Sequence, residues 1–465
     1  MNVLYLNTHD IGRYLQTYGY PVDTPNLLQL SREGMAFSRM YCASPTCSPS
    51  RGALLTGQYP HSNGLIGLSH RGFRMDKRHH LARFLRDNGY ETVLSGVQHE
   101  EKLHEETGIG YERCLNPPEY YRRDMEQCDL YTWQDELAAA NAVWYLKERK
   151  AEERPFFLTA GFGCTHREYP RVPADYETDY VQVPMSLPDL PEIRKDMAGM
   201  KIAVKTVDRL CGDILQALRE CGEYENTVIL FTTDHGLPFP GMKCHLYDEG
   251  MGVSFVMRYP GMPQTHKVSK ALLSQTDVFP TLCEILGLEK PEWLEGHSFL
   301  PILRGEAQKI RTEVFGEINY HVAYEPARCV RTCRYKYIVR WDNGYEYAPS
   351  VDTDDSLSKE VLREFGYFQR KRQSEELYDL MLDPQERENL AGEDTYASVL
   401  ADMRERLKSW QMKSGDPLLA RGRMELPEGA ICATADSYST KSQVLQPECE
   451  KYVAALRGLL QNPIG

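Results

Sequence analysis

Several features are missing from this sequence of 465 residues. No long apolar run is free of charges, which excludes a transmembrane helix. Basic residues are outnumbered, with 54 Lys and Arg against 67 Asp and Glu and a net charge of -13, which argues against the basic face that nucleic-acid binding needs. An anionic small substrate stays open, because a few local basic residues can reverse the field inside a cleft.

The N-terminus lacks the marks of a secretory leader. No basic segment, apolar core or small-residue cleavage site precedes the apolar run that starts at Asn2. A disulfide framework is also missing, because the 13 cysteines are odd in number and scattered, and Cys329 and Cys333 are too isolated to indicate a zinc site. We therefore expect free thiols and a cytoplasmic protein without a membrane partner, unless a leader has been removed.

The length fits two or three domains at about 150 residues each. Up to about residue 310, buried apolar runs alternate with helical patterns, which predicts a sheet with crossover helices. Strands are expected at 2–6, 91–95, 155–162, 226–231 and 253–257, and helices at 25–34, 80–88, 134–150, 193–221 and 278–288. Residues 329–340 alternate polar and apolar positions like one antiparallel strand, and another strand at 376–380 and a helix at 399–410 follow. We expect divisions at 1–311, 312–425 and 426–465.

The most specific motif is Cys47-Ser-Pro-Ser-Arg51, followed by Leu55-Thr-Gly57. A lone cysteine of this kind could simply be buried ahead of a helix, but here further motifs follow in a fixed order. Together they resemble the signature of the type I sulfatases, C-x-P-S-R-x-x-x-x-T-G. The resemblance extends over roughly residues 1–425.

The resemblance implies that a maturation enzyme oxidises Cys47 to formylglycine. A hydrated aldehyde has two hydroxyls on one carbon, so one can attack sulfur while the other later loses a proton, expelling sulfate and restoring the aldehyde. Arg51 would hold this hydrate, and the helix N-terminus that follows Cys47 favours anionic oxygen. The implied chemistry is therefore covalent catalysis of sulfate hydrolysis.

Acidic residues follow two of the buried strands, with Asp10 after the first and Asp234 after the strand at 226–231. Acids in such places usually serve a charge partner. The type I sulfatases have Asp-Asp after the first strand; here Asp10 matches the second acid, and His9 replaces the first. The resemblance implies a divalent metal bound by His9, Asp10, Cys47, Asp234 and His235. Calcium is the ion that the resemblance implies, whereas the imidazoles of His9 and His235 leave Mn, Mg or Zn open.

Three further residues match family positions that contact sulfate or move protons. They are His99 in the segment Gly96-Val-Gln-His99, His166 after the strand at 155–162, and Lys243. The family's lysine two residues before His99 is Val97 here, so one sulfate-binding cation is missing. A histidine can act as acid or base near neutral pH, and Lys243 would neutralise charge on the transferring group together with Arg51. Each residue taken alone could equally be an ordinary hydrogen-bonded side chain.

The implied fold is an α/β, alkaline-phosphatase-like core with a mixed, mostly parallel sheet between helices. A smaller C-terminal α+β subdomain with an antiparallel sheet would follow. The segments Gly236-Leu-Pro-Phe-Pro240 and Leu377-Tyr-Asp379 look most like the heparan N-sulfatase branch, the N-sulfoglucosamine sulfohydrolases. The expected substrate is a sulfate ester or sulfamate of a glycosaminoglycan-derived sugar. Arginines near the motifs could bind further anionic groups, namely Arg13, Arg71, Arg74, Arg167 and Arg171.

Two alternatives stay open. A phosphonate monoester or phosphodiester hydrolase shares this fold and nucleophile. The second alternative is a relative that binds sulfated glycans without hydrolysing them. It is favoured by the missing lysine at Val97 and by the change from Asp to His9. The sequence leaves open whether the chain forms a homo-oligomer.

Overall fold

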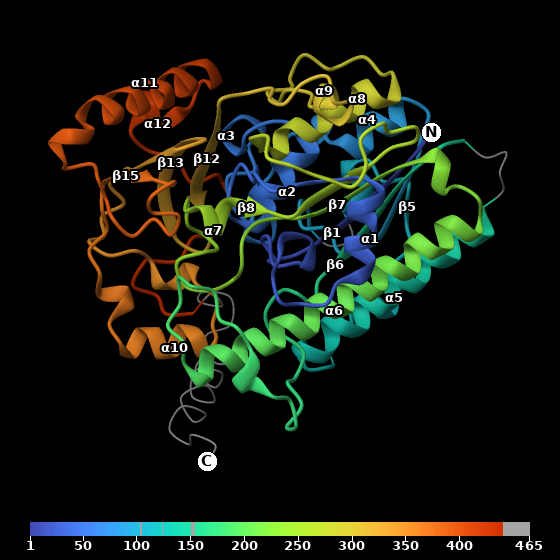
Figure 1. Cartoon of the computed structure of the whole chain (residues 1–465), viewed down its shortest axis with the longest axis horizontal. Helices are drawn as coiled ribbons and strands as arrows, with labels where there is room; N and C mark the ends of the chain where they lie inside the picture. The colour runs from blue at the N-terminus through green and yellow to red at the C-terminus, as the bar shows by residue number, and fades with distance from the viewer. Residues whose placement is uncertain (103–104, 123, 150–153, 440–465) are drawn as a thin grey trace.

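The computed structural model describes residues 1–102, 105–122, 124–149 and 154–439 of this protein. A large α/β body carries the first part of the chain, and a smaller region built on an antiparallel sheet lies beside it (Figure 1). The main sheet has eight strands in the order β10-β2-β9-β7-β1-β6-β4-β5. Their bounds are β1 Asn2–Thr8, β2 Met35–Phe37, β4 Glu91–Gly96, β5 Arg113–Cys114, β6 Phe156–Phe162, β7 Thr227–Thr233, β9 Phe255–Arg258 and β10 Lys267–Ser269.

The strand pairs of this sheet are parallel except for the two that β9 makes with β2 and β7. The expected mixed, mostly parallel sheet is therefore confirmed. A small second sheet has the order β11-β3-β8, formed by Leu273–Ser274, Met40–Tyr41 and Gly252–Val253. The antiparallel sheet has the order β12-β13-β14-β15, formed by Glu313–Tyr320, Tyr324–Thr332, Tyr335–Arg340 and Glu375–Asp379.

The central strand β1 is buried along its whole length, and its two faces enter different cores. Val3 and Tyr5 pack into one core, and Leu4 and Leu6 pack into the other, because successive side chains of a strand alternate between faces. An apolar run without polar alternation is what a parallel strand covered by helices on both sides requires.

Helices cover both faces of the main sheet (Figure 1). The first core includes residues of α2, α4 and α8, and the second includes residues of α1, α5 and α6. These helices span α1 Pro25–Glu33, α2 Cys47–Thr56, α4 Leu81–Asp87, α5 Gln127–Glu148, α6 Pro191–Glu220 and α8 Val278–Leu286. The shorter or later helices are α3 Pro60–Asn63, α7 Asp248–Met251, α9 Leu300–Leu303, α10 Leu357–Glu364, α11 Ala397–Ser414 and α12 Pro417–Arg421.

Three predicted elements differ from the structure. The strand predicted at 253–257 is divided into β8, which ends at Val253 in the small sheet, and β9, which begins at Phe255 in the main sheet. The single strand predicted at 329–340 is wrong, because β13 ends at Thr332 and β14 begins at Tyr335. The turn between them contains Cys333 and Arg334, and no Gly, Pro or Asn marks it. The helix predicted from residue 134 begins seven residues earlier, at Gln127, and its predicted end at 150 lies outside the described residues.

The smaller region packs α11 against its antiparallel sheet through an apolar cluster that includes Val330, Leu377, Leu407 and Trp410. The described part of the last predicted segment contacts both regions of the chain. The Ala433 N–H donates to the carbonyl of Val322 after β12, and the Ile431 N–H donates to that of Arg71. The boundaries at 311 and 425 stay a prediction. Across the described ranges, no helix is both long and apolar enough to cross a membrane.

Candidate active site

Four predicted ligands lie at the carboxyl ends of the two central strands. His9 and Asp10 directly follow β1, and Asp234 and His235 directly follow its parallel neighbour β7. Neighbouring parallel strands present their carboxyl ends at the same edge of a sheet, so the side chains that follow them meet there. These residues are at most 3% exposed.

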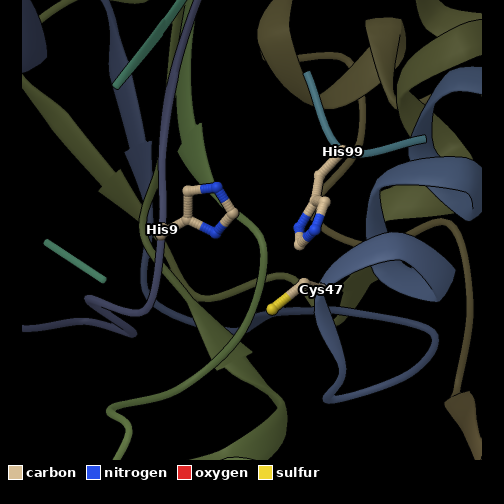
Figure 2. A group of neighbouring side chains, drawn as sticks. All are labelled: His9, Cys47 and His99. Carbon is tan, nitrogen blue, oxygen red and sulfur yellow. The ribbon is translucent and has the colours of Figure 1, made fainter. Parts of the chain in front are cut away.

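Three more predicted residues reach the same edge. His166 follows β6, the other neighbour of β1, and His99 follows β4. Cys47 is the first residue of α2, whose ten residues are all buried. Figure 2 shows the side chains of His9, Cys47 and His99 converging, and one ligand atom of each lies within 4.8 Å of the others. The sequence motifs therefore come together as one site.

The backbone at Asp10 is held in an uncommon conformation. Its φ is 56°, in the left-handed region that residues other than glycine rarely adopt. The Asp10 N–H donates to Asp234 Oδ1 at 2.9 Å, so the strand end after β1 is tied to the one after β7. Strain of this kind persists where the surroundings enforce it, and it is concentrated at functional sites.

Arg51 supports the second carboxylate from behind. Its guanidinium donates to Asp234 Oδ2 at 3.2 Å, to Asn7 Oδ1 at 2.6 Å and to the Thr8 carbonyl at 3.1 Å. Burial alone would raise the pKa of the Asp234 carboxyl, but the interaction with His235 and the charge of Arg51 outweigh it and hold that pKa well below its usual range. Arg51 thus keeps Asp234 ionised, while its expected contact with a hydrate stays a prediction.

Cys47 lies at the base of the site with 1% of its surface exposed. Its Sγ is 3.3 Å from His235 Nε2. Burial raises the pKa of the Cys47 thiol well above its ordinary value, so the sulfur stays protonated and is a poor nucleophile as it stands. The Thr-Gly of the motif ends the helix that Cys47 begins, because Gly57 adopts a φ of 68° at the C-terminus of α2.

Several buried atoms in this cluster lack hydrogen-bond partners. His235 Nδ1 lies 3.0 Å from the Gly236 carbonyl and must donate to it, which leaves Nε2 to face Asp10 Oδ1 at 3.1 Å. His9 Nδ1 lies 2.9 Å from Asp234 Oδ2. In the part of the chain that the structure describes, neither His9 Nδ1 nor Asp10 Oδ1 makes a well-formed hydrogen bond in spite of these short distances. Orphaned buried atoms are costly, and a cation between them would satisfy them.

The donor set therefore fits a divalent metal. His9, Asp10, Cys47 and Asp234 each offer one atom within 4.8 Å of the others. Burial, together with the nearby Arg51 charge, lowers the pKa of His9 to about 4, so its ring is neutral at physiological pH and able to bind a cation. The predicted ligand set stays a prediction, with the geometry in its favour.

Lys243 lies beside this cluster and is almost completely enclosed. Its Nζ donates to Asp10 Oδ2 at 3.1 Å, to Asp354 Oδ2 at 2.8 Å and to His166 Nε2 at 3.4 Å. His166 can accept because its Nδ1 donates to the Arg167 carbonyl at 2.7 Å. Burial alone would lower the pKa of Lys243, but the carboxylates of Asp10 and Asp354 raise it well above its usual value. Lys243 is therefore a fixed positive charge.

His99 forms a stacked pair with a residue that the sequence did not single out. The ring of His70 lies parallel to it at 5.4 Å, and His70 Nδ1 is 3.3 Å from His99 Nε2. Burial and the neighbouring imidazoles of His70 and His9 lower the pKa of His99 well below its usual value. A neutral His99 can accept a proton.

Of the predicted site residues, His9, Cys47, His99 and His166 line a cavity of about 400 Å³. Its lining combines the site with residues of the smaller region, namely His9, Cys47, Val97, His99, His166, His321, Asp354 and Asp355. Sequence reasoning missed His321 and Asp354, which lie 4% and 6% exposed. Asp354 belongs to an acidic run, Asp352-Thr-Asp-Asp355, which on sequence alone suggests a solvated loop. A larger cavity of about 1030 Å³ between the two regions has none of the predicted site residues in its lining.

The arginines near the motifs have different positions. Arg71 and Arg167 line the cavity, although Arg167 also forms a buried ion pair with Asp196. Arg13 does not reach the cavity but lies over the Tyr41 ring at 4.8 Å. Arg74 pairs with Glu101, and Arg171 pairs with Glu126. Arg13, Arg74 and Arg171 are therefore outside the cavity lining.

Two family models match this chain. The one described as Sulfatase matches residues 1–288, and the one described as N-sulphoglucosamine sulphohydrolase, C-terminal, matches residues 241–361. An ulvan-active sulfatase of Formosa agariphila is 28% identical, over 89% of this chain and 75% of the relative. Human N-sulphoglucosamine sulphohydrolase is 27% identical, over 92% of this chain and 90% of the relative.

Solved structures share the fold. A 2-O GAG sulfatase superposes with a TM-score of 0.69 at 24% identity, over 90% of this chain and 93% of that one. The phosphonate monoester hydrolase of Agrobacterium radiobacter superposes with a TM-score of 0.69 at 21% identity, over 93% of this chain and 100% of that one. At these identities the likeness concerns the fold alone, and it does not separate the two reaction types.

Proposed function

This chain belongs to the sulfatase family, and we propose that it removes sulfate from sugars by hydrolysing sulfate esters or sulfamates. The family match confirms the resemblance to the sulfatases, and the class of activity is that of a sulfuric ester hydrolase. The C-terminal family match and the human relative support a glycosaminoglycan-derived sugar such as N-sulfoglucosamine.

One observation carries this proposal. Cys47 lies on the lining of a sugar-sized cavity, where it meets the two carboxylates and two imidazoles that follow β1 and β7. A thiol kept protonated by burial is a poor nucleophile, which supports the proposal that formylglycine made by a maturation enzyme, and not the thiol itself, attacks sulfur. The hydrate of that aldehyde supplies one hydroxyl to form a bond to sulfur as the leaving bond breaks, and a second hydroxyl whose deprotonation restores the aldehyde and releases sulfate.

The chain's own residues would handle the charges and protons. The leaving oxygen or nitrogen takes its proton from His166, which lines the cavity and would first take up a second proton at Nε2, or from Lys243, whose Nζ donates to that atom at 3.4 Å. Lys243 is fixed by Asp10 and Asp354, and its charge offsets the negative charge that builds on the sulfuryl group. A neutral His99 takes the proton of the remaining hydroxyl. A divalent metal held by His9, Asp10, Asp234 and His235 would supply Lewis-acid stabilisation of anionic oxygen.

The first experiment is a mass measurement of the peptide that contains Cys47, from protein made in its native host. We expect the sulfur of Cys47 to be replaced by an aldehyde oxygen or its hydrate. The matured protein should then release sulfate from a panel of O- and N-sulfated sugars, while the Cys47→Ala variant should not. Turnover by Cys47→Ala would contradict the proposed nucleophile.

The cavity also bears on substrate size. A volume of about 400 Å³ is at the lower end of small-molecule sites, so it suits one or two sugar units better than a polymer. We expect sulfated mono- and disaccharides to be hydrolysed faster than heparan chains, as measured by sulfate release at equal sulfate concentration. The reverse order would refute this size preference.

The fold likeness to a phosphonate monoester hydrolase favours one alternative reaction. Higher kcat/KM on aryl phosphodiesters than on any sulfated sugar would support that alternative over the sulfatase proposal. The absence of the family lysine at Val97 favours a glycan-binding relative instead. Binding of sulfated sugars without sulfate release, by protein with a matured Cys47, would support that reading.

A further inference from the structure

The site departs from the family pattern at one buried side chain, His9, which replaces the first of two aspartates. His9 is 3% exposed, and among the described residues its Nδ1 finds only Asp234 Oδ2, at 2.9 Å, without a well-formed hydrogen bond. Its ring meets the edges of the His99 and His166 rings at 5.5 and 5.4 Å, so it lies among polar groups and not in an apolar core. The unsatisfied nitrogen points into the carboxylate cluster.

A second imidazole faces the same cluster. His235 is oriented by its Nδ1, which donates to the Gly236 carbonyl at 3.0 Å, and this leaves the Nε2 lone pair 3.1 Å from Asp10 Oδ1. Two electron-rich atoms at that distance repel unless a proton or a cation lies between them. His9 and His235 thus approach the carboxylates of Asp234 and Asp10, respectively, in the same way.

The outer contacts of both carboxylates are already occupied. Lys243 binds Asp10 Oδ2, and Arg51 binds Asp234 Oδ2, while Asp234 Oδ1 accepts the backbone N–H groups of Asp10 and His235. This leaves Asp10 Oδ1 and His9 Nδ1 as the unsatisfied atoms of the cluster. A single cation could therefore bind both His9 Nδ1 and Asp10 Oδ1.

We infer that this site selects a first-row divalent transition ion, such as Mn²⁺ or Zn²⁺, over Ca²⁺, with His9 as the ligand that sets the preference. Ca²⁺ is bound by oxygen ligands, whereas imidazole nitrogen suits transition ions, and two imidazoles with two carboxylates form a mixed set. The inference rests on the proposed metal-dependent function, since it concerns the ion of that same site.

The test is a metal titration of full-length protein after chelation, followed by the thermal unfolding midpoint. We expect Mn²⁺, Co²⁺ or Zn²⁺ to raise the midpoint at a concentration at least about ten-fold lower than Ca²⁺ requires. The variant His9→Asp restores the family's pair of acids and should reverse that order. The control His70→Asp changes another histidine of the cavity lining that belongs to none of the clusters of metal-ligating groups, and it should keep the wild-type order.

A second measurement does not depend on any variant. Protein purified without chelator should contain a transition ion and no stoichiometric calcium, as measured by plasma mass spectrometry. The inference would be overturned if the wild type binds Ca²⁺ more tightly than the transition ions, or if folded His9→Asp keeps the wild-type order of metal affinity. If that variant does not fold, the order of affinity in the wild type decides alone. Metal binding is measured without turnover, so the two proposals can fail separately. A protein that prefers transition ions but hydrolyses no sulfated sugar would contradict the proposed function and still support this inference.

Discussion

The contact between Lys243 and Asp354 joins the two regions of the chain at the site, and it can be tested by one substitution. Asp354 follows the antiparallel strands β12–β14 in the chain, and its Oδ2 accepts from Lys243 Nζ at 2.8 Å. Burial alone would raise the pKa of Asp354, but the charge of Lys243 outweighs it and holds that pKa well below its usual range. The variant Asp354→Asn keeps the shape of the side chain and removes its charge.

The magnitude follows from the type of bond that is lost. A hydrogen bond to a charged group contributes about 1.5–3 kcal/mol, and charge roughly doubles the strength of such a bond. Asparagine can still accept from the charged Lys243, so we expect about half of the contribution to be lost, about 0.8–1.5 kcal/mol. At about 1.4 kcal/mol for each factor of ten, a loss of this size in the transition state should lower kcat/KM about four- to twelve-fold.

The assay is sulfate release from the preferred sulfated sugar, with thermal unfolding as a check on folding. Asp355→Asn is the matched control, because Asp355 lines the same cavity but pairs with Lys359 at 2.9 Å and not with Lys243. It should keep kcat/KM within about two-fold, since no bond to Lys243 is lost. Equal losses in both variants, or no loss in Asp354→Asn, would refute the assigned role of Asp354.

Three further predictions concern single side chains. Cys47→Ala should abolish turnover yet shift the free energy of unfolding by only about 1 kcal/mol, as urea unfolding would show, because one small buried atom is lost. His80→Asn should flatten the acid dependence of stability: burial lowers the pKa of His80 to about 3, so between about 6.5 and 3 the unfolded chain binds a proton that the folded chain does not. The free energy of unfolding of the wild type therefore falls with acidification. Between pH 7 and 5.5 that of the variant should fall by about 1 kcal/mol less, as measured by urea unfolding. The exposed His297→Asn variant is the control and should follow the wild type. Lys102→Ala should raise KM for a sulfated sugar up to about five-fold at constant kcat, because Lys102 is an exposed cation of the cavity lining; a fall in kcat alone would contradict this.

Local sequence patterns predicted the part of the site that follows from strands of the main sheet. Asp10 and Asp234 each come directly after a buried apolar strand, and parallel pairing of β1 with β7 is enough to bring them together. Cys47 was found through its motif, whose proline, arginine and Thr-Gly belong to one helix, α2. In these cases a short stretch of chain determines both the element and the side chain that it presents.

Residues placed by packing between distant parts of the chain were not predictable in this way. Asp354 is 111 positions from the lysine that it binds, and the fold of the smaller region decides that they meet. His70 stacks on His99 because the turn at 69–71 returns to the end of β4, and no periodic pattern records such a contact. The same limit explains the missed turn at Cys333, where no turn-forming residue interrupts the alternation of polar and apolar positions.

The two carboxylates that bind Lys243 come from different parts of the chain. A buried ammonium is tolerated when carboxylates surround it, and here one carboxylate comes from the strand end after β1 and the other from the smaller region. The first of these belongs to the motifs of the reaction, while the second lies with His321 and Asp355 on the cavity lining. We propose that residues of the motifs carry the reaction and that His321 and Asp354, which belong to none of the motifs singled out in the sequence, contribute to the choice of sugar. Substitutions of Asp354 and His321 should therefore alter the ranking of sulfated substrates, whereas those of Cys47 should remove all of them together.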